Sequence, residues 1–273
     1  MRPLSVIAIA VSAATAVFAS AFAPAQAQDA YGAGPGYSVD VGGAVGIKPK
    51  YEGSNEYEVF GFPVIFPDFG GGGLGGRVTV RGADDVRFRL LEFSGFELGP
   101  LAGYAFGREE DDGDLLRGLG DVDDGLVLGA YAGYRFGPVL LDVSYHQIVT
   151  GDDDGYQIRF GGSLEQELRP GFIGTLRVGA TYADDVYMRS HFGISGVQAL
   201  NSVAGLSAYD AEAGIKDIHV ELGAKYELTE RITLKATGQY ARLVGDAADS
   251  PIVESEDQFI GVLGATYRFD FQR

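Results

Sequence analysis

Hydrophobic and polar residues alternate strictly along residues 217–243. In 217–228 every even-numbered residue is apolar, and every odd-numbered residue is polar or glycine. The alternation resumes at Ile232, after the polar turn 229–231. Period-two alternation on both sides of a short turn predicts a long antiparallel hairpin. Its strands, at about 12 residues, are longer than the roughly 5–6 residues usual in soluble proteins. They match the about 9–11 residues that a tilted strand needs to cross a bilayer.

The same alternation recurs along the rest of the chain. It predicts strands at 37–47, 57–66, 77–81, 86–91, 96–106, 126–136, 139–146, 156–168, 172–182, 217–228, 232–243 and 259–271. We therefore predict an all-β fold, a closed antiparallel transmembrane β-barrel of about 12 strands with apolar side chains toward lipid and polar side chains toward the lumen. Pro63 cannot donate to a strand ladder, so we expect a bulge or break there.

The connections between the predicted strands differ in length on the two sides of the barrel. Very short turns fall on one side, at 137–138, 169–171 and 229–231, whereas the connections at 108–124, 151–155, 183–216 and 243–256 fall on the other. Short periplasmic turns and longer outer loops are typical of bacterial outer-membrane barrels. A large soluble β-sandwich, the alternative fold, would have shorter strands and no such asymmetry.

The N-terminus has the pattern of a secretory signal. Arg2 precedes an apolar run from Leu4 to Phe18, and Ala25-Gln26-Ala27 resembles a cleavage site. The apolar run is shorter than the roughly 20 residues of a membrane-spanning helix, which argues against an uncleaved anchor. We predict a signal peptide at 1–27 and a single barrel domain at 28–273, located in the outer membrane of a Gram-negative cell.

Charge and composition exclude several classes of function. The formal net charge is −17, and cysteine is absent. Nucleic-acid binding needs a basic surface, so we exclude it; thiol catalysis and cysteine metal sites are excluded as well. The acidic runs 109–112, 121–124 and 152–154 lack calcium-loop spacing and are expected to be solvated outer loops; the alternative is that they hold Ca²⁺ or share divalent ions with lipopolysaccharide phosphates. The glycine-rich segment 70–76 is expected to be a periplasmic turn, and no motif predicts a cofactor.

Asp142, Ser144 and His146 follow one another on one face of a predicted strand, which raises the possibility of a hydrolase. Neighbours on one strand face are separated by a rise of roughly 6.6 Å, beyond the reach of a nucleophile–base hydrogen bond. These residues also point into the lumen, away from lipid substrates. We therefore expect them to be structural polar residues and the protein not to be an enzyme.

Charged residues of both signs are predicted to face the lumen. The expected charge ladder comprises Arg87, Arg89, Arg135, Asp142, Arg159, Glu165, Arg177, Glu221, Lys225, Lys235 and Arg268, with Arg77, Arg81, Asp40, Glu97 and Glu167 on the same faces. Charges removed from bulk water need partners, so we expect arginine–carboxylate bridges across the lumen. A barrel of about 12 strands lies between filled and open barrels. We expect a constricted lumen, with a water-filled pore as the alternative.

Several loop motifs together resemble the MipA/OmpV family of outer-membrane proteins. The residues that carry the resemblance are Tyr51, Gly53, Ser54, Asp184, Asp185, Tyr187, Met188, Lys216, Asp217, Gly245, Asp246, Asp249, Ser250 and Pro251. The resemblance implies a non-enzymatic outer-membrane barrel in contact with outer-membrane lipid and lipopolysaccharide. It also implies a scaffold role in which the barrel interacts with a murein hydrolase or synthase. Other members are described as porins or adhesins, so two alternatives stay open: a narrow or substrate-selective channel, and an adhesin acting through the long acidic loops.

Overall fold

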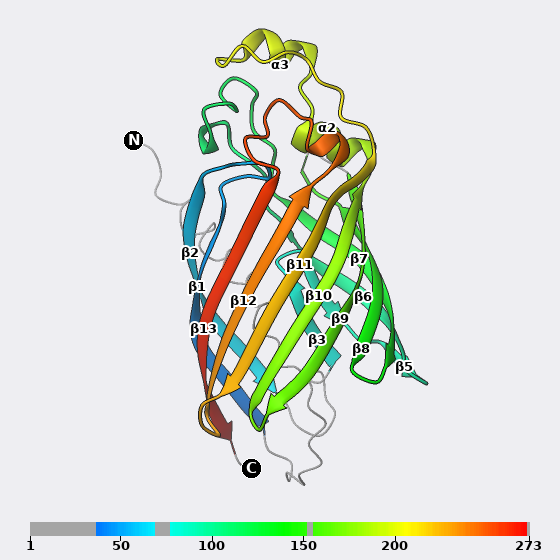
Figure 1. The fold of residues 1–273 in the computed structure, drawn as a ribbon, viewed down its shortest axis with the longest axis vertical. Helices are drawn as coiled ribbons and strands as arrows, with labels where there is room; N and C mark the ends of the chain where they lie inside the picture. Colours follow the sequence, from blue (N-terminus) through cyan, green and yellow to red (C-terminus); the bar gives the residue numbers. More distant parts are fainter. Residues whose placement is uncertain (1–36, 69–76, 152–154, 272–273) are drawn as a thin grey trace.

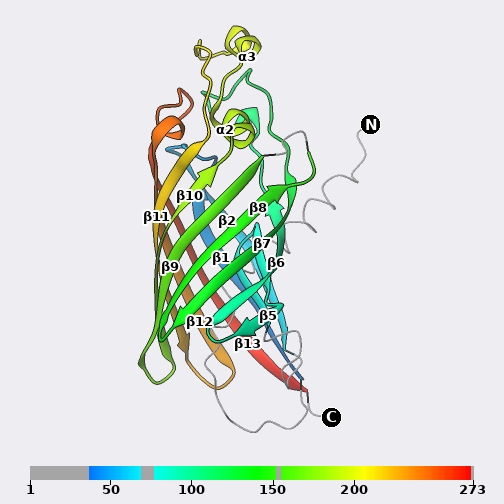
Figure 2. The ribbon, with the colours of Figure 1, turned by 90° about the vertical axis from the view of Figure 1, so that its right-hand side faces the viewer.

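The computed structural model describes residues 37–68, 77–151 and 155–271. The predicted signal peptide at 1–27, the glycine-rich segment 70–76 and the acidic residues 152–154 lie outside the described residues. One antiparallel sheet forms most of the described chain, and Figures 1 and 2 show its strands tilted and wrapped around a common axis. The all-β prediction is therefore confirmed.

The strands are close to those predicted from the alternation. They are β1 (Tyr37–Pro49), β2 (Tyr57–Asp68), β3 (Val78–Gly82), β4 (Asp85–Phe88), β5 (Leu91–Phe93), β6 (Phe96–Ala105), β7 (Gly125–Phe136), β8 (Val139–Ile148), β9 (Tyr156–Arg169), β10 (Phe172–Ala183), β11 (Gly214–Glu227), β12 (Ile232–Leu243) and β13 (Asp257–Phe271). Two differences stand out: the short strand β5 was not expected, and β11 begins before residue 217.

Neighbouring strands follow the order β2-β1-β13-β12-β11-β10-β9-β8-β7-β6-β4-β3, and β5 pairs with β6 beside this path. β1 pairs antiparallel with β13, so the first and last described strands are neighbours. The two ends of the path are β2 and β3, and no backbone pairing joins them within the described residues. Pro63 lies within β2 opposite Gly43 in a continuous register, so the break expected there is absent.

Alternate residues of the long strands form an apolar outer surface. Exposed aliphatic and aromatic side chains include Val45 on β1, Leu128 on β7, Val178 on β10, Leu222 on β11 and Leu263 on β13. Their neighbours along each strand point toward the axis and are partly or fully buried. A belt of exposed apolar side chains around a sheet with a polar interior is the pattern expected where lipid replaces water on the outside.

The two ends of the sheet differ. The tight β7–β8, β9–β10 and β11–β12 connections lie at one end, here called the turn end, and the helices lie at the other, the cap end (Figure 1). The connection at 183–216, expected to be a loop, contains helices α2 (Asp185–Phe192) and α3 (Gly196–Asn201). Single turns of 3-10 helix, η3 (Glu110–Asp112) and η4 (Gly245–Ala247), lie in two other connections. No helix in the described residues is long and apolar enough to span a membrane.

The β3–β4 hairpin approaches β6 so closely that two glycines of β6 are needed. A Cβ on Gly103 would lie 2.3 Å from the Cα atom of Asp84, and a Cβ on Gly99 would lie 1.8 Å from the carbonyl oxygen of Phe88. The amide of Tyr104 donates to the carbonyl of Ala83 at 3.0 Å, which fixes the hairpin turn at this place. These glycines therefore determine where the Asp84 carboxylate is held.

Replacing Gly103 by alanine is expected to destabilise the fold, because the new methyl group meets backbone atoms that cannot move independently. We expect a loss of about 1–3 kcal/mol in the free energy of unfolding. Urea titration of the refolded protein, followed by the gel mobility of unboiled samples, measures it. Gly238→Ala is the matched control, since a Cβ at Gly238 meets nothing within 4 Å. Equal stability of the two variants would contradict the role given to Gly103.

Candidate functional site

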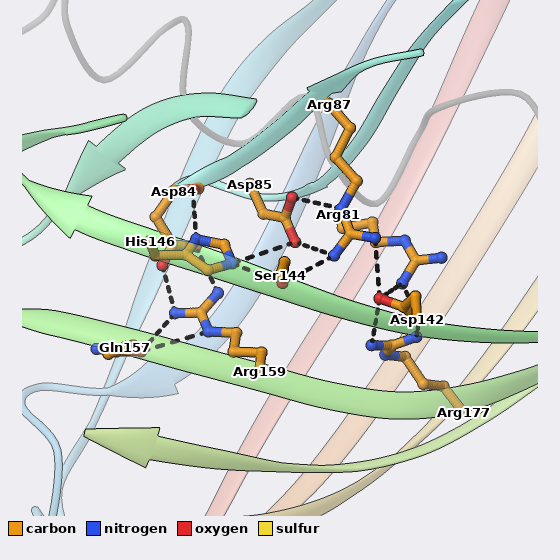
Figure 3. Close-up of polar contacts among 10 residues, drawn as sticks. All are labelled: Arg81, Asp84, Asp85, Arg87, Asp142, Ser144, His146, Gln157, Arg159 and Arg177. Carbon is orange, nitrogen blue, oxygen red and sulfur yellow. Dashed lines mark hydrogen bonds and ion pairs between the residues drawn. The ribbon is translucent and has the colours of Figure 1, made fainter. Parts of the chain in front are cut away.

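A layer of buried polar side chains crosses the lumen beside β8. Asp142, Ser144 and His146 point inward from that strand, and their relative exposures are 6%, 2% and 3%. Figure 3 shows them facing side chains of the β3–β4 hairpin on one side and of β9 and β10 on the other. Residues far apart in the sequence therefore meet in one network, which we call the lumen layer.

Asp142 is the acceptor at the centre of the lumen layer. Arg81 of β3 donates from Nη1 to both of its carboxylate oxygens at 2.9 Å, and Arg87 of β4 donates to Oδ2 at 2.9 Å. Arg177 of β10 donates to Oδ1 at 2.6 Å. A buried carboxylate is tolerated when cations and donors replace its lost hydration, and three guanidinium groups do so here. Because these arginines come from three strands, Asp142 links the β3–β4 hairpin to the opposite wall.

Two further carboxylates complete the layer. Arg87 donates from Nε and Nη2 to the two oxygens of Asp85, at 2.7 and 2.8 Å, and its guanidinium lies 4.8 Å from the ring centre of Tyr131. Arg159 of β9 forms a two-pronged ion pair with Asp84 in the hairpin turn. Both aspartates were absent from the predicted charge ladder. The available signal was the short polar turn, which places two acids in sequence with only Val86 between them and Arg87.

Ser144 and His146 are in direct contact. The Nε2 atom of His146 lies 2.9 Å from the hydroxyl oxygen of Ser144, so the expectation that strand rise keeps them apart is wrong. The rise separates Cα atoms, and the side chains lean toward each other. The Nδ1 atom lies 3.1 Å from the carbonyl oxygen of Asp84, which can only accept, so Nδ1 carries a proton. In the neutral ring, Nε2 would then accept from the hydroxyl of Ser144.

A serine hydroxyl donating to an imidazole is the pairing that hydrolases use for nucleophilic attack. Here, however, Ser144 is buried and its oxygen also accepts from Nη2 of Arg87 at 3.2 Å. A reacting carbonyl would have to displace the guanidinium and reach the middle of the packed lumen layer. The arrangement is therefore that of a structural network, in which the histidine bridges the serine and the hairpin turn.

Arg268, Lys225 and Arg89, three of the other predicted lumen residues, form separate ion pairs. Arg268 donates to Asp40 across β13 and β1 at 2.8 and 3.0 Å, Lys225 contacts Glu227 at 2.7 Å, and Arg89 contacts Glu92 at 3.3 Å. Glu221 lies opposite Arg177 in the register of β10 and β11, but Arg177 donates to Asp142 instead. Arg135 is exposed near the β7–β8 turn, and Glu165 is partly buried. Lys235 lies directly opposite Lys225.

A small polar cavity opens at the turn end of the lumen. Its volume is about 150 Å³. Basic side chains of Lys225, Lys235 and Arg268 line it together with acidic Asp40, Glu227 and Glu230. Charges of both signs with adjacent threonines make this cavity suitable for water or a small polar solute.

All the loop motifs of the expected family gather at the cap end. Tyr51, Gly53 and Ser54 lie in the β1–β2 connection, Tyr187 and Met188 are buried in α2, Lys216 and Asp217 are buried at the start of β11, and Gly245 to Pro251 form the β12–β13 connection. Their side chains and backbones join these three connections and the start of β11 over the mouth of the sheet. We call this assembly the cap.

Glu52 is the ionic centre of the cap. It accepts a hydrogen bond of 3.0 Å from the hydroxyl of Tyr187 and forms an ion pair with Lys216. Lys216 also contacts Asp217 at 3.1 Å, and Asp217 in turn lies 2.9 Å from His219. Burial and the neighbouring Glu52 carboxylate raise the pKa of Tyr187, which therefore stays a donor at neutral pH.

Hydrogen bonds between aspartate side chains and backbone amides also join the segments of the cap. Asp184 accepts from the amides of Tyr156 and Tyr187 at 2.9 and 3.0 Å, Asp185 accepts from Ala213 at 2.8 Å, and Asp246 accepts from Glu212 at 2.8 Å. Asp249 donates its amide to Gly245, and Ser250 donates its hydroxyl to the carbonyl of Phe192. Tyr51, Leu116, Leu119, Ile194 and Ile252 form an apolar cluster beneath these bonds, called the cap core.

Arg108 lies below the cap with only 4% of its surface exposed. Its Nη2 atom donates to the carbonyl of Ser190 at 3.4 Å, whereas Nε and Nη1 have no hydrogen-bond partner in the described residues. Burial lowers the pKa of this guanidinium. Within the described residues, no group of three or more histidine, cysteine, aspartate or glutamate side chains is placed to hold a metal ion.

Comparison with known proteins identifies similar chains. A family model described as MltA-interacting protein MipA matches residues 41–269. The chain is 32% identical over 95 residues to the putative outer membrane protein YiaT of Escherichia coli strain K12, a match that covers 35% of this chain and 37% of YiaT. It is 25% identical over 174 residues to outer membrane protein Omp26La of Vibrio anguillarum, a match that covers 63% of this chain and 64% of that protein.

The matches thus span between about a third and just under two thirds of these curated relatives. Among solved structures, an outer membrane channel from Pseudomonas putida F1 is similar at 12% identity with a TM-score of 0.41, covering 90% of this chain and 100% of that one. The named relatives are outer-membrane proteins, and this chain is one as well.

Replacing Asp142 by asparagine is expected to leave three arginines beside a neutral acceptor. Removing one partner of a buried ion network costs about 3–5 kcal/mol, because the remaining charges are not solvated. We expect a loss of that size in the free energy of unfolding, measured by urea titration of the refolded protein. Asp210→Asn, which removes the exposed partner of Arg189, is the control and should change stability far less. If the two variants lose similar stability, the lumen layer does not hold the fold together.

Proposed function

Because the chain belongs to the family described as MltA-interacting protein MipA, which matches residues 41–269, we propose that it is a non-enzymatic outer-membrane barrel that serves as a scaffold for murein-remodelling enzymes. Residues 1–27 act as a signal peptide, and residues 28–273 form one barrel closed between β2 and β3. The turn end faces the periplasm and the cap end faces the outside, as the lengths of the connections suggest.

The lumen layer is the observation that carries this proposal. Arg81, Arg87 and Arg177 converge on Asp142 from different strands, and Arg159 closes on Asp84. Side chains that pair with one another fill this part of the lumen. A filled lumen favours a rigid barrel over one that conducts solutes. The protein then acts through its outer surfaces: the apolar belt contacts outer-membrane lipid, and acidic outer connections contact lipopolysaccharide through shared divalent ions.

The turn end offers the surface for a murein hydrolase or synthase. Exposed charges line its rim, among them Glu167 and Arg169 near the β9–β10 turn and Glu230 and Arg231 in the β11–β12 turn. A compact rim of charged turns suits a polar contact of modest area, such as those of transient complexes. The family description names an interaction with MltA, and we extend this class of partner to the present chain.

Site-specific photo-crosslinking in cells tests the scaffold. A photoreactive residue in place of Glu230 is expected to capture a murein hydrolase or synthase, because this position lies on the periplasmic rim. The same residue in place of Leu200 on α3 is the matched control, since that position lies at the opposite end (Figure 1). The scaffold proposal fails if crosslinkers at residues 137, 169 and 230 all capture no murein enzyme.

A narrow channel is the second candidate, and the cavity at the turn end favours it. The cavity gives polar solutes access to Lys225, Lys235 and Arg268 at the periplasmic mouth. A channel would additionally need a path past the lumen layer and the cap. The two candidates therefore differ in whether ions cross the barrel.

Planar-bilayer recording separates these candidates. The scaffold proposal expects no conductance steps from the purified, folded protein, because the paired side chains block the lumen. The variant carrying Arg87→Ala and Asp142→Ala removes both members of one central pair and should leak if the layer is the barrier. Folding of each sample is checked by its mobility shift on boiling. Resolved steps from the unmodified protein would favour the channel instead.

A further inference from the structure

The tip of the cap end exposes large apolar side chains that the lipid-facing belt does not explain. Val197 and Leu200 of α3 and the following Val203 have relative exposures of 69%, 88% and 75%. Figures 1 and 2 place α3 at the far end of the molecule, beyond α2 and away from the strands. Exposed apolar groups clustered outside a lipid belt mark a surface for binding another molecule. We call these three residues the apolar tip.

The apolar tip is held in place by its surroundings. Ser195 and Gln198 form a reciprocal capping box at the start of α3, and Gln198 also donates to the carbonyl of Leu119 at 2.6 Å. The amide of Val203 donates to the carbonyl of Arg117 at 3.0 Å. Ala199, on the other side of α3, packs against the cap core. The hydrogen bonds and the partly buried Ala199 thus fix α3 on the cap, and Val197 and Leu200 stay exposed in that position.

The connection that is hydrogen-bonded to the apolar tip is strongly acidic. The connection 106–124, to which α3 is bonded, contains eight acidic residues and two arginines. Asp111, Asp114 and Asp123 are exposed in it. The neighbouring connection 244–256 contains four acidic residues and no lysine or arginine. Such a one-sided charge attracts cations and repels anionic surfaces over roughly a Debye length, about 8 Å at physiological salt.

We propose that the apolar tip and the acidic connection 106–124, here called the acidic collar, bind a basic, amphipathic peptide segment of another protein. Apolar side chains of the segment pack on Val197, Leu200 and Val203, and its lysines or arginines face the exposed acids of 106–124. Charge complementarity selects this occupant. A second copy would bring an equally acidic collar against the first, and an anionic lipid surface would be repelled in the same way. The surface lies at the end opposite the murein-facing rim, so this binding is separate from the scaffold function.

A labelled helical peptide of lysine and leucine serves as the probe. Fluorescence anisotropy measures its binding to the full-length protein in zwitterionic nanodiscs, with the signal of empty discs subtracted. The double variant Leu200→Ser with Val203→Ser should bind about tenfold more weakly, the effect of losing about one buried apolar side chain. The triple variant Asp111→Asn, Asp114→Asn and Asp123→Asn should bind more weakly and with a shallower dependence on salt.

Two controls make the result specific. Val186→Ser alters an exposed valine on α2 and should leave binding unchanged. A lysine and serine peptide of equal charge should bind more weakly than the lysine and leucine peptide. The proposal is overturned if the tip variant binds like the unmodified protein, or if both peptides bind equally. It is also overturned if sedimentation shows a dimer that the tip variant abolishes, since the occupant would then be a second copy. None of these outcomes bears on the crosslinking at Glu230.

Discussion

A charged side chain that is removed from water needs a partner of opposite charge. In this protein that requirement determines how the side chains of the lumen are arranged. Asp142 accepts from arginines of β3, β4 and β10, and no neighbouring strand pair could supply all three. The ion pairs therefore act as long-range crosslinks through the lumen. They hold the short β3–β4 hairpin, which has few ladder bonds of its own, against the wall formed by β8, β9 and β10. Glycines of β6 permit the close approach that brings Asp84 to Arg159.

The cap is also held together by contacts between segments that are far apart in the sequence. Glu52 joins the β1–β2 connection to α2 and β11, and the cap core joins the same connection to 106–124 and 244–256. Segments from the first and last thirds of the chain are thereby tied over one mouth. The inner face of the cap thus combines ion pairs with a buried apolar cluster. The outer face of the cap carries the acidic connections and the apolar tip.

Alternation along the chain was sufficient to predict the long strands, since lipid outside and polar groups inside impose period two. It was insufficient for β5 and for α2 and α3, whose short segments show no sustained period. Local signals for the helices existed: Asp184 caps α2, and Ser195 with Gln198 forms the capping box of α3. Several of the predicted charged residues are paired in the lumen layer, but their partners depended on which strands lie across it. Asp84 and Asp85 were missed for that reason. The contact between Ser144 and His146 was missed because the rise along a strand gives the distance between Cα atoms, whereas the two side chains lean toward each other.

The position of Arg177 in the chain sets when the ion pairs at Asp142 can be complete. Arg81 and Arg87 lie on β3 and β4, Asp142 lies on β8, and Arg177 follows only on β10. All three guanidinium groups can therefore meet Asp142 only once β10 lies in the sheet. The cluster is a property of the assembled sheet, and it cannot guide the pairing of the strands that precede β10.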